Sequence, residues 1–413
     1  MAQLNPKHQA KRPRVRERGA VLVIVVMLLP LLISFMALAI DVGYLYSVKR
    51  KLQTVADAAA LACSHQMQRA QPCTYQNGAN NDFAIDLPSF YGIDWSNVNT
   101  SQPAANQVQV QVSQSTPTFF LKVISINSVD VNAIARAEMR PNCVTTLDPA
   151  AANSFQTSTG ANLQMPDCGI FTHSNNASAF NAVAGSTVNA LSVDIVGNKT
   201  ATGSVTPTPM VSVTGVGDPL AMLPDMTPGA CDHINLEVKS STTLTPGVYC
   251  GGITLRLKPT VTFSPGIYYL VGGGLNTGPG YAAIIGTGVV FFNTQALPTY
   301  PYGPILIGVA NGNSFQLSAP TSGAYKGILF YQDRKVASGA TSVFGGGANQ
   351  PLQMTGTLYF PTTNVTFQGQ STTVAGAFTN VIAKNVLFSG LSRMNYQAGA
   401  SWASVSGPVR LIQ

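Results

Sequence analysis

The chain has 413 residues and a formal net charge of +7, which at first suggests a nucleic-acid ligand. Residues 1–51 carry nine of the 23 basic residues and two of the 16 acidic residues, so the rest of the chain has no net charge. The excess therefore belongs to the N-terminus, and the sequence predicts no nucleic-acid partner.

An uncharged apolar run occupies positions 20–40, directly after a basic segment. A helix of this length, at about 1.5 Å per residue, spans the roughly 30 Å hydrocarbon layer of a bilayer. A cleavable signal sequence has a shorter apolar region followed by small residues, whereas Asp41, Val42, Gly43 and Tyr44 follow here. The run predicts a retained anchor; a cleaved signal and a buried soluble helix are the weaker alternatives.

Basic residues before the run determine the orientation of this anchor. Cytoplasmic flanks of membrane helices carry an excess of Lys and Arg, so the N-terminus is expected in the cytoplasm and everything after residue 41 outside it. The topology-determining residues are Lys11, Arg12, Arg14, Arg16 and Arg18.

Helix-forming residues continue beyond the membrane, so we expect one transmembrane and extended helix over 19–68, kinked at Pro30. Asp57 and its small neighbours form a surface on which another helix could pack closely. Packing on a sheet of this protein is the equally weighted alternative. The helix-packing residues are Ala56, Asp57, Ala58, Ala59 and Ala60.

Residues 69–141 predict a small α+β unit. The stretch "QVQVQVS" at 107–113 and the stretch "SVDVNAIARAEM" at 128–139 alternate as half-buried strands do. Between them, "TPTFFLKVIS" begins with the cap-like Thr116 and predicts a short helix. A further short element is expected around "FAIDLPSFYGI" at 83–93.

Residues 142–413 predict a parallel β-solenoid, because two internal repeats occur in a region of short strands and turns. "FQTSTGANL" at 155–163 recurs as "FNAVAGSTV" at 180–188, and "PGVY" at 246–249 recurs as "PGIY" at 265–268. Periods of roughly 20–25 residues are typical of solenoid coils. A β-sandwich is the main structural rival.

Six cysteines form three sequential close pairs in the part of the chain expected outside the cytoplasm. The spacings from Cys143 to Cys168 and from Cys231 to Cys250 equal the two repeat periods, so disulfides between adjacent coils are expected. Zinc is the competing use, but no C-x-x-C occurs. The disulfide candidates are Cys63, Cys73, Cys143, Cys168, Cys231 and Cys250.

Catalytic groups are sparse. Residues 226–413 contain only three acidic residues, Asp232, Glu237 and Asp333, and nothing pairs them across a groove as glycoside hydrolysis requires. The glycine-rich stretches lack the Lys-Ser/Thr pair of a phosphate-binding loop. We expect no enzyme activity, no cofactor, no metal and no small-molecule substrate. An envelope adhesin or a β-helix protein that binds or processes polysaccharide stays open as the alternative.

Residues 16–62 resemble the N-terminal segment of TadG-like proteins of the Tad/Flp pilus assembly machinery. The resemblance rests on "RGA" before the apolar run, Pro30 within it, "AIDVG" at its end and "LQTVADAAALA" beyond it. "FFLKVISINSVDVNAIARAE" and "GTLYFPTTNVTFQG" are also similar to family members. The resemblance implies an inner-membrane protein with a periplasmic bulk that works with pilin or other Tad/Flp assembly proteins in making type IVb pili.

Two departures from related patterns qualify this expectation. Processing after Gly19 would place Ile24 at the fifth position of the new terminus, where pilins usually carry Glu, so a retained anchor is favoured over a minor pilin. The Asp-x-Ser-x-Ser metal motif of longer relatives is missing from this sequence. The expected organisation is a basic tail (1–18), the long helix (19–68), the α+β unit (69–141) and the disulfide-linked solenoid (142–413).

Overall fold

The computed structural model describes residues 20–68, 93, 97–104, 107–139, 142–278, 283–308, 314–336, 340–346, 352–369, 379–391, 393–395 and 409–412. The chain divides into two compact units. The first contains residues 1–62, 74–137 and 411–413, and the second contains residues 63–73 and 138–410. The expected element at 83–93 lies outside the described residues, apart from Ile93.

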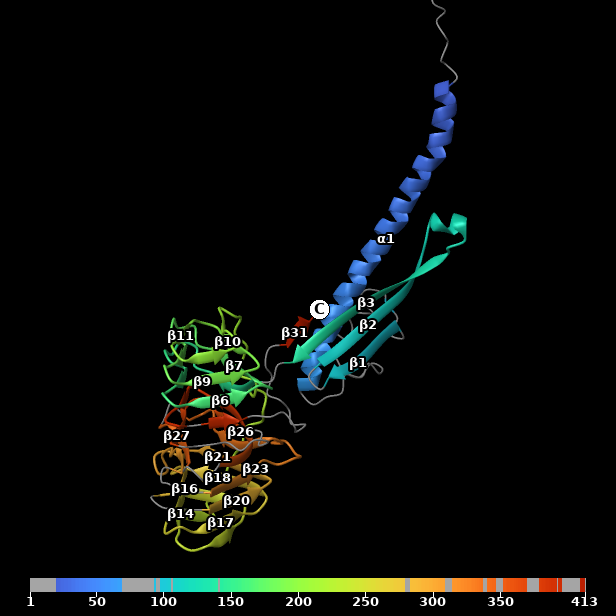
Figure 1. Ribbon diagram of the computed structural model, residues 1–413. Helices are drawn as coiled ribbons and strands as arrows, with labels where there is room; N and C mark the ends of the chain where they lie inside the picture. Colours follow the sequence, from blue (N-terminus) through green and yellow to red (C-terminus); the bar gives the residue numbers. More distant parts are fainter. Residues whose placement is uncertain are drawn as a thin grey trace, which may run out of the picture. The chain divides into compact units, whose positions relative to one another are not determined.

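A single long helix, α1 (Ala20–Gln68), begins the first unit and continues without a break through Pro30 (Figure 1). Its apolar half is exposed, and the most hydrophobic stretch of 18 residues contains no buried residue. Length and composition make α1 able to cross a membrane.

The rest of the first unit is a small antiparallel sheet in the strand order β1-β2-β3-β31. In β2, alternate valines are buried, as the sequence pattern predicts. The C-terminal strand joins this sheet, although the sequence analysis assigns 142–413 to the solenoid. The strands are β1 (Val98–Ala104), β2 (Gln107–Pro117), β3 (Ser128–Met139) and β31 (Val409–Ile412).

The short helix expected at the β2–β3 connection is reduced to one 3-10 turn, η2 (Leu121–Ile124). Thr116, the expected helix cap, lies inside β2 instead. The segment only closes a hairpin, in which Thr118 N–H donates to the Asn127 carbonyl at 3.1 Å, so there is no room for further helical turns.

The second unit is a parallel β-solenoid, and every pairing between its described strands is parallel, which excludes the β-sandwich. Its first coils contain β4 (Asn142–Thr146), β5 (Phe155–Thr157), β6 (Asn162–Met165), β7 (Gly169–Thr172), β8 (Phe180–Ala182), β9 (Thr187–Ala190), β10 (Val193–Ile195), β11 (Lys199–Ala201), β12 (Ser204–Thr206) and β13 (Met210–Val211).

The later coils begin after a strand-free segment at 212–232. They contain β14 (His233–Val238), β15 (Thr242–Leu244), β16 (Gly247–Leu255), β17 (Thr260–Phe263), β18 (Gly266–Val271), β19 (Leu275–Asn276), β20 (Ala283–Thr287), β21 (Val289–Thr294), β22 (Ile305–Ile307), β23 (Ser314–Ser318), β24 (Ile328–Gln332), β25 (Ser342–Gly346), β26 (Leu352–Phe360), β27 (Val365–Gly369), β28 (Thr379–Ala383), β29 (Val386–Phe388) and β30 (Arg393–Asn395).

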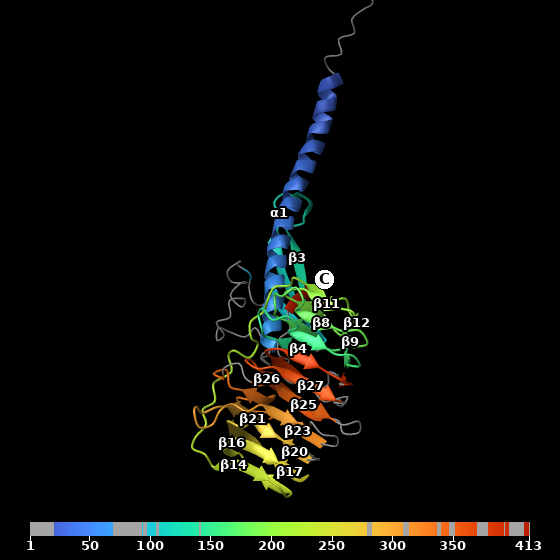
Figure 2. The same cartoon turned by 90° about the vertical axis from the view of Figure 1, so that its left-hand side faces the viewer.

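The coils are not stacked in the order of the sequence. The last coil pairs with the first, through β28 with β4, β29 with β5 and β30 with β6. The coils from β4 to β12 therefore stack beyond the C-terminal coil, and β14 lies at the opposite end of the stack (Figures 1 and 2). The chain enters the solenoid in the middle, winds to one end, crosses to the other end and winds back.

Both sequence repeats correspond to neighbouring coils. In the first repeat Phe155 pairs with Phe180 along the strands, and their rings stack at 4.6 Å between centroids. In the second repeat the rings of Tyr249 and Tyr268 stack at 5.9 Å, but the backbone ladder is shifted so that Gly247 pairs with Tyr268. Aromatic stacking between coils fills the core and contributes beyond the area it buries.

Candidate functional site

Asp41 connects the helix to the sheet at the end of the apolar run. Its carboxylate is almost fully buried and accepts three backbone hydrogen bonds, from Phe119 at 2.9 Å, Phe120 at 2.9 Å and Leu121 at 2.7 Å. Tyr44, one turn further along α1, packs edge-on against the Phe119 ring at 5.2 Å between centroids. A buried carboxylate is costly unless it is hydrogen-bonded, so these contacts fix the β2–β3 hairpin beside residue 41.

This role of Asp41 was not predicted from the sequence, in which the residue only marks the end of the apolar run. A signal was present, because a charged side chain next to an anchor needs a partner. The partner could not be named from the sequence, since it consists of backbone N–H groups 78 to 80 positions away.

The small residues of α1 pack against the sheet of the same unit. Ala56, Ala59 and Ala60 are fully buried, Ala58 is half-buried, and Val108 and Val110 of β2 are buried as well. The C-terminal half of α1 lies along the small sheet (Figure 1). Of the two alternatives for this surface, the structure shows packing on the chain's own sheet.

Polar contacts fix the level of the helix along the sheet. Lys49 donates to the Asn132 carbonyl, and the Gln53 amide donates to the Ile134 carbonyl at 3.1 Å. The same amide donates to Asp57 at 2.8 Å, so that carboxylate orients Gln53. Together with Asp41 these contacts connect the helix to the hairpin at three levels along its axis.

Two disulfides join neighbouring coils, as the cysteine spacings predict. Cys143 is bonded to Cys168 between β4 and β7, and Cys231 is bonded to Cys250 next to β14 and β16. Cys63 is also disulfide-bonded, and Cys73 lies outside the described residues. The topology-determining residues Lys11, Arg12, Arg14, Arg16 and Arg18 lie outside them too.

The segment 212–232, here named the strap, runs along the side of the stack (Figure 2). Leu220, Leu223 and Met226 of the strap pack over an outward-facing apolar stripe. This stripe comes from consecutive coils and contains Ile267, Tyr269, Val290, Phe292, Ile328, Tyr331, Tyr359 and Ile382. The strap thus covers apolar surface that parallel strands would otherwise expose to solvent.

Arg334 is the main polar contact of the strap. Its guanidinium donates to the Leu220 carbonyl, to the Leu223 carbonyl at 3.2 Å and to the Tyr359 hydroxyl at 2.9 Å. The Tyr359 hydroxyl in turn donates to Asp218. Burial raises the pKa of Tyr359, and the Asp218 carboxylate raises it further. The network gives Arg334, the last residue of the stretch "YQDR" at 331–334, a structural role.

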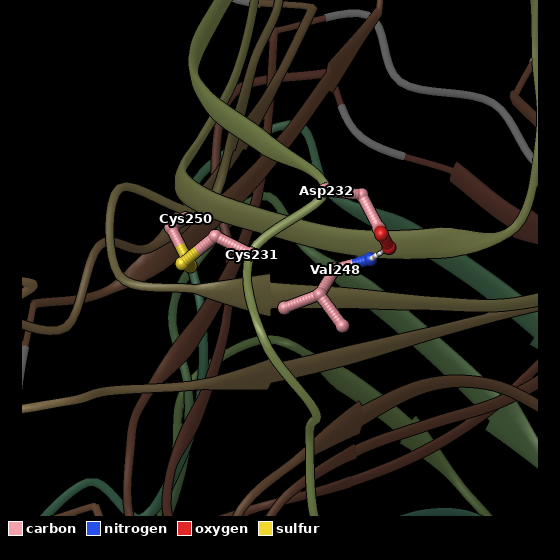
Figure 3. Close-up of a disulfide and its surroundings, with 4 residues drawn as sticks. All are labelled: Cys231, Asp232, Val248 and Cys250. Carbon is pink, nitrogen blue, oxygen red and sulfur yellow. Dashed lines mark hydrogen bonds between the residues drawn. A yellow bond between two sulfur atoms is a disulfide. The ribbon is translucent and has the colours of Figure 1, made fainter.

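At the C-terminal end of the strap, Cys231 and Asp232 attach it to β16. Figure 3 shows the disulfide to Cys250 beside the hydrogen bond that Val248 N–H donates to Asp232 at 2.8 Å. Both contacts bind the end of the strap to β16, so this acid has a structural partner.

The other two acidic residues of 226–413 also have partners. Glu237 forms ion pairs with Lys239 at 2.8 Å and with Arg256, and the hydrogen bond from Lys239 lowers the pKa of this carboxyl. Asp333 accepts from the Thr294 hydroxyl at 2.7 Å and from Lys335 N–H at 2.9 Å. Within the described residues, no group of three His, Cys, Asp or Glu side chains is arranged to hold a metal ion.

Comparison with known proteins gives a match for the N-terminal part of the chain alone. Residues 19–63 match a family model described as putative Flp pilus-assembly TadE/G-like. Neither the curated proteins nor the solved structures that were compared contain a match. The matched residues include the exposed apolar helix, Asp41 and the small residues that pack on the sheet. Within residues 19–63 the chain is therefore similar to putative Flp pilus-assembly TadE/G-like proteins.

Proposed function

We propose that the protein is a membrane-anchored, structural and non-catalytic component of Tad/Flp (type IVb) pilus assembly, with its solenoid on the periplasmic side of the inner membrane. The observation that carries this proposal is the TadE/G-like match at residues 19–63, which contains the uncharged apolar run at 20–40 of α1. The basic residues before the apolar run support a cytoplasmic N-terminus.

In this proposal the solenoid is the part of the protein that binds pilin or other assembly proteins. Its acids take part in local structural contacts, and its interior is filled by stacked aromatic rings. At one end of the stack, none of the described strands pairs with the outer edge of β14, and Ile234 there is 62 % exposed. Open strand edges accept extended segments of partners by backbone pairing.

The orientation is tested by cysteine accessibility in intact cells and in spheroplasts. Gln3→Cys would mark the N-terminal tail, and Thr243→Cys would mark an exposed position in β15. A membrane-impermeant maleimide should modify Thr243→Cys in spheroplasts and Gln3→Cys only after lysis. The reverse pattern would overturn the proposed topology.

The role in assembly is tested by the amount of pilin sheared from the cell surface. A strain that lacks the gene should lose surface pilin, and complementation with the full chain should restore it. Unchanged surface pilin would reject the assembly role. Reduced surface adherence with normal pilin would instead favour an envelope adhesin or a polysaccharide-binding protein.

A further inference from the structure

The tip of the β2–β3 hairpin, residues 119–126, exposes an unusual number of large apolar side chains. Val123 is 86 % exposed, Ile124 65 % and Phe119 57 %, and Phe120 and Ile126 are exposed as well. The stretch "FFLKVISI" has one charged residue, Lys122, and no acid. Adjacent exposed apolar side chains of this kind mark an interaction surface.

The position of this tip along α1 indicates what it contacts. Asp41 accepts hydrogen bonds from the backbone of residues 119–121, so the tip lies beside the point where the apolar run of 20–40 ends. In a helix that crosses a bilayer, this point lies at the boundary between hydrocarbon and headgroups. Tyr44 and Tyr46, which follow Asp41, are exposed in the zone where membrane proteins concentrate aromatic side chains.

We propose that the hairpin tip is a second membrane contact, in which Phe119, Val123 and Ile124 insert into the phospholipid leaflet that surrounds the end of α1. This inference rests on the membrane anchoring in the proposed function and adds a contact to it. Apolar side chains of interfacial segments enter the headgroup and acyl boundary by about 5–10 Å. Lys122, also exposed, suits the phosphates of anionic lipids.

We favour the bilayer over a protein partner because the tip continues the exposed apolar surface of α1. The exposed apolar surface of α1 ends at the same level as the tip, and the Asp41 carboxylate between them is already satisfied by backbone N–H groups. Insertion therefore places no unpaired acid in the interface.

A second contact would fix the orientation of the first unit on the membrane. A single helix can tilt and rotate in a bilayer, and anchors at its interface restrict both motions. With the hairpin bound at Asp41 and inserted at its tip, the sheet would project from the membrane in one direction.

The test uses the full chain in vesicles of phosphatidylethanolamine and phosphatidylglycerol that contain nitroxide-labelled lipids. A bimane fluorophore is attached to Val123→Cys and, as a matched control, to Ile134→Cys, an exposed apolar position on the same hairpin. Ile134 lies at the level of Gln53, which is roughly 18 Å beyond Asp41 along the helix. Leu31→Cys is the positive control within the apolar run.

We expect the nitroxide lipids to quench the fluorophore at position 123 at least about twofold more strongly than at position 134. Equal weak quenching at 123 and 134, with strong quenching at 31, would reject the inserted tip while the anchor stands; a tip that contacts protein would give this result. No quenching at 31 would reject the membrane anchor and the tip contact together. None of these outcomes depends on whether the protein assembles pili.

Discussion

Phe388 and Phe155 lie in adjacent coils with their ring centroids 5.9 Å apart, although most of the solenoid sequence separates them. Phe388 also stacks on Phe367 at 5.0 Å, and Phe155 stacks on Phe180 at 4.6 Å, so one aromatic row continues through the junction. This junction joins the C-terminal coils to the N-terminal coils, and one stack results from two separately wound parts.

Removal of either ring at the junction should destabilise the whole stack. Phe155→Ala and Phe388→Ala should each lower the free energy of unfolding by about 3–5 kcal/mol, because both side chains are buried. The double variant should show a coupling of about 0.5–1.5 kcal/mol in chemical denaturation. Strict additivity of the two losses would contradict the contact across the junction.

Arg334 should be essential for holding the strap. Arg334→Met leaves the Leu220 and Leu223 carbonyls without their donor and should cost about 2–3 kcal/mol of stability. The neighbouring Lys335→Met is the control: Lys335 is exposed and its ion pair with Asp225 is at the surface, so its loss should cost less than about 0.5 kcal/mol. Limited proteolysis should cut within 212–232 faster in the Arg334 variant alone.

The disulfide at the end of the strap should contribute about 3 kcal/mol, as expected for cysteines at a sequence separation of 19. Replacement of Cys231 and Cys250 by Ser should lower the denaturation midpoint and free the end of the strap for proteolysis. The matched variant without Cys143 and Cys168 should lose similar stability but leave cleavage in the strap unchanged. Peptide mapping without reduction should recover both of these pairs, and a different partner for any of these four cysteines would contradict the contacts between neighbouring coils.

Gly273 should not tolerate a side chain. Its φ is +68°, and an added Cβ would lie 1.9 Å from the Gly251 carbonyl oxygen of the neighbouring coil. Gly273→Ala should therefore cost about 2–5 kcal/mol in thermal or chemical unfolding. Gly229→Ala, where a Cβ would have no neighbour within 4 Å, should change stability by less than about 0.5 kcal/mol. Equal effects of the two changes would show that the glycine turns are not closely stacked.

His173 should make the solenoid less stable in mild acid. Burial lowers the pKa of its imidazole below 6.5, and the Asp218 carboxylate opposes this shift only in part. As the pH falls below 6.5, the unfolded chain takes up a proton that the folded chain accepts less readily, so stability falls. His173→Gln should reduce the difference in unfolding midpoint between about pH 7.5 and about pH 5. An unchanged pH dependence would remove His173 as the cause.

The membrane segment and the existence of coils could be predicted from sequence, because each depends on local or strictly periodic features. The uncharged run at 20–40 is long enough to have few alternatives to a membrane span. The first repeat aligns Phe155 with Phe180, and identical spacing of large apolar side chains is what stacked coils require. The two disulfides between coils followed from the same periods.

The order of the coils was decided only by the tertiary structure. Parallel strands pair through backbone groups that are the same at every coil, so a repeat identifies a coil but does not say which edge it joins. The apolar stripe under the strap and the aromatic row across the junction select the observed order, and their residues are scattered from Phe155 to Phe388. Likewise, Asp41 acquires its function only when the hairpin brings three backbone N–H groups to its carboxylate, since hydrogen bonds between positions so far apart in the chain leave no local pattern in the sequence.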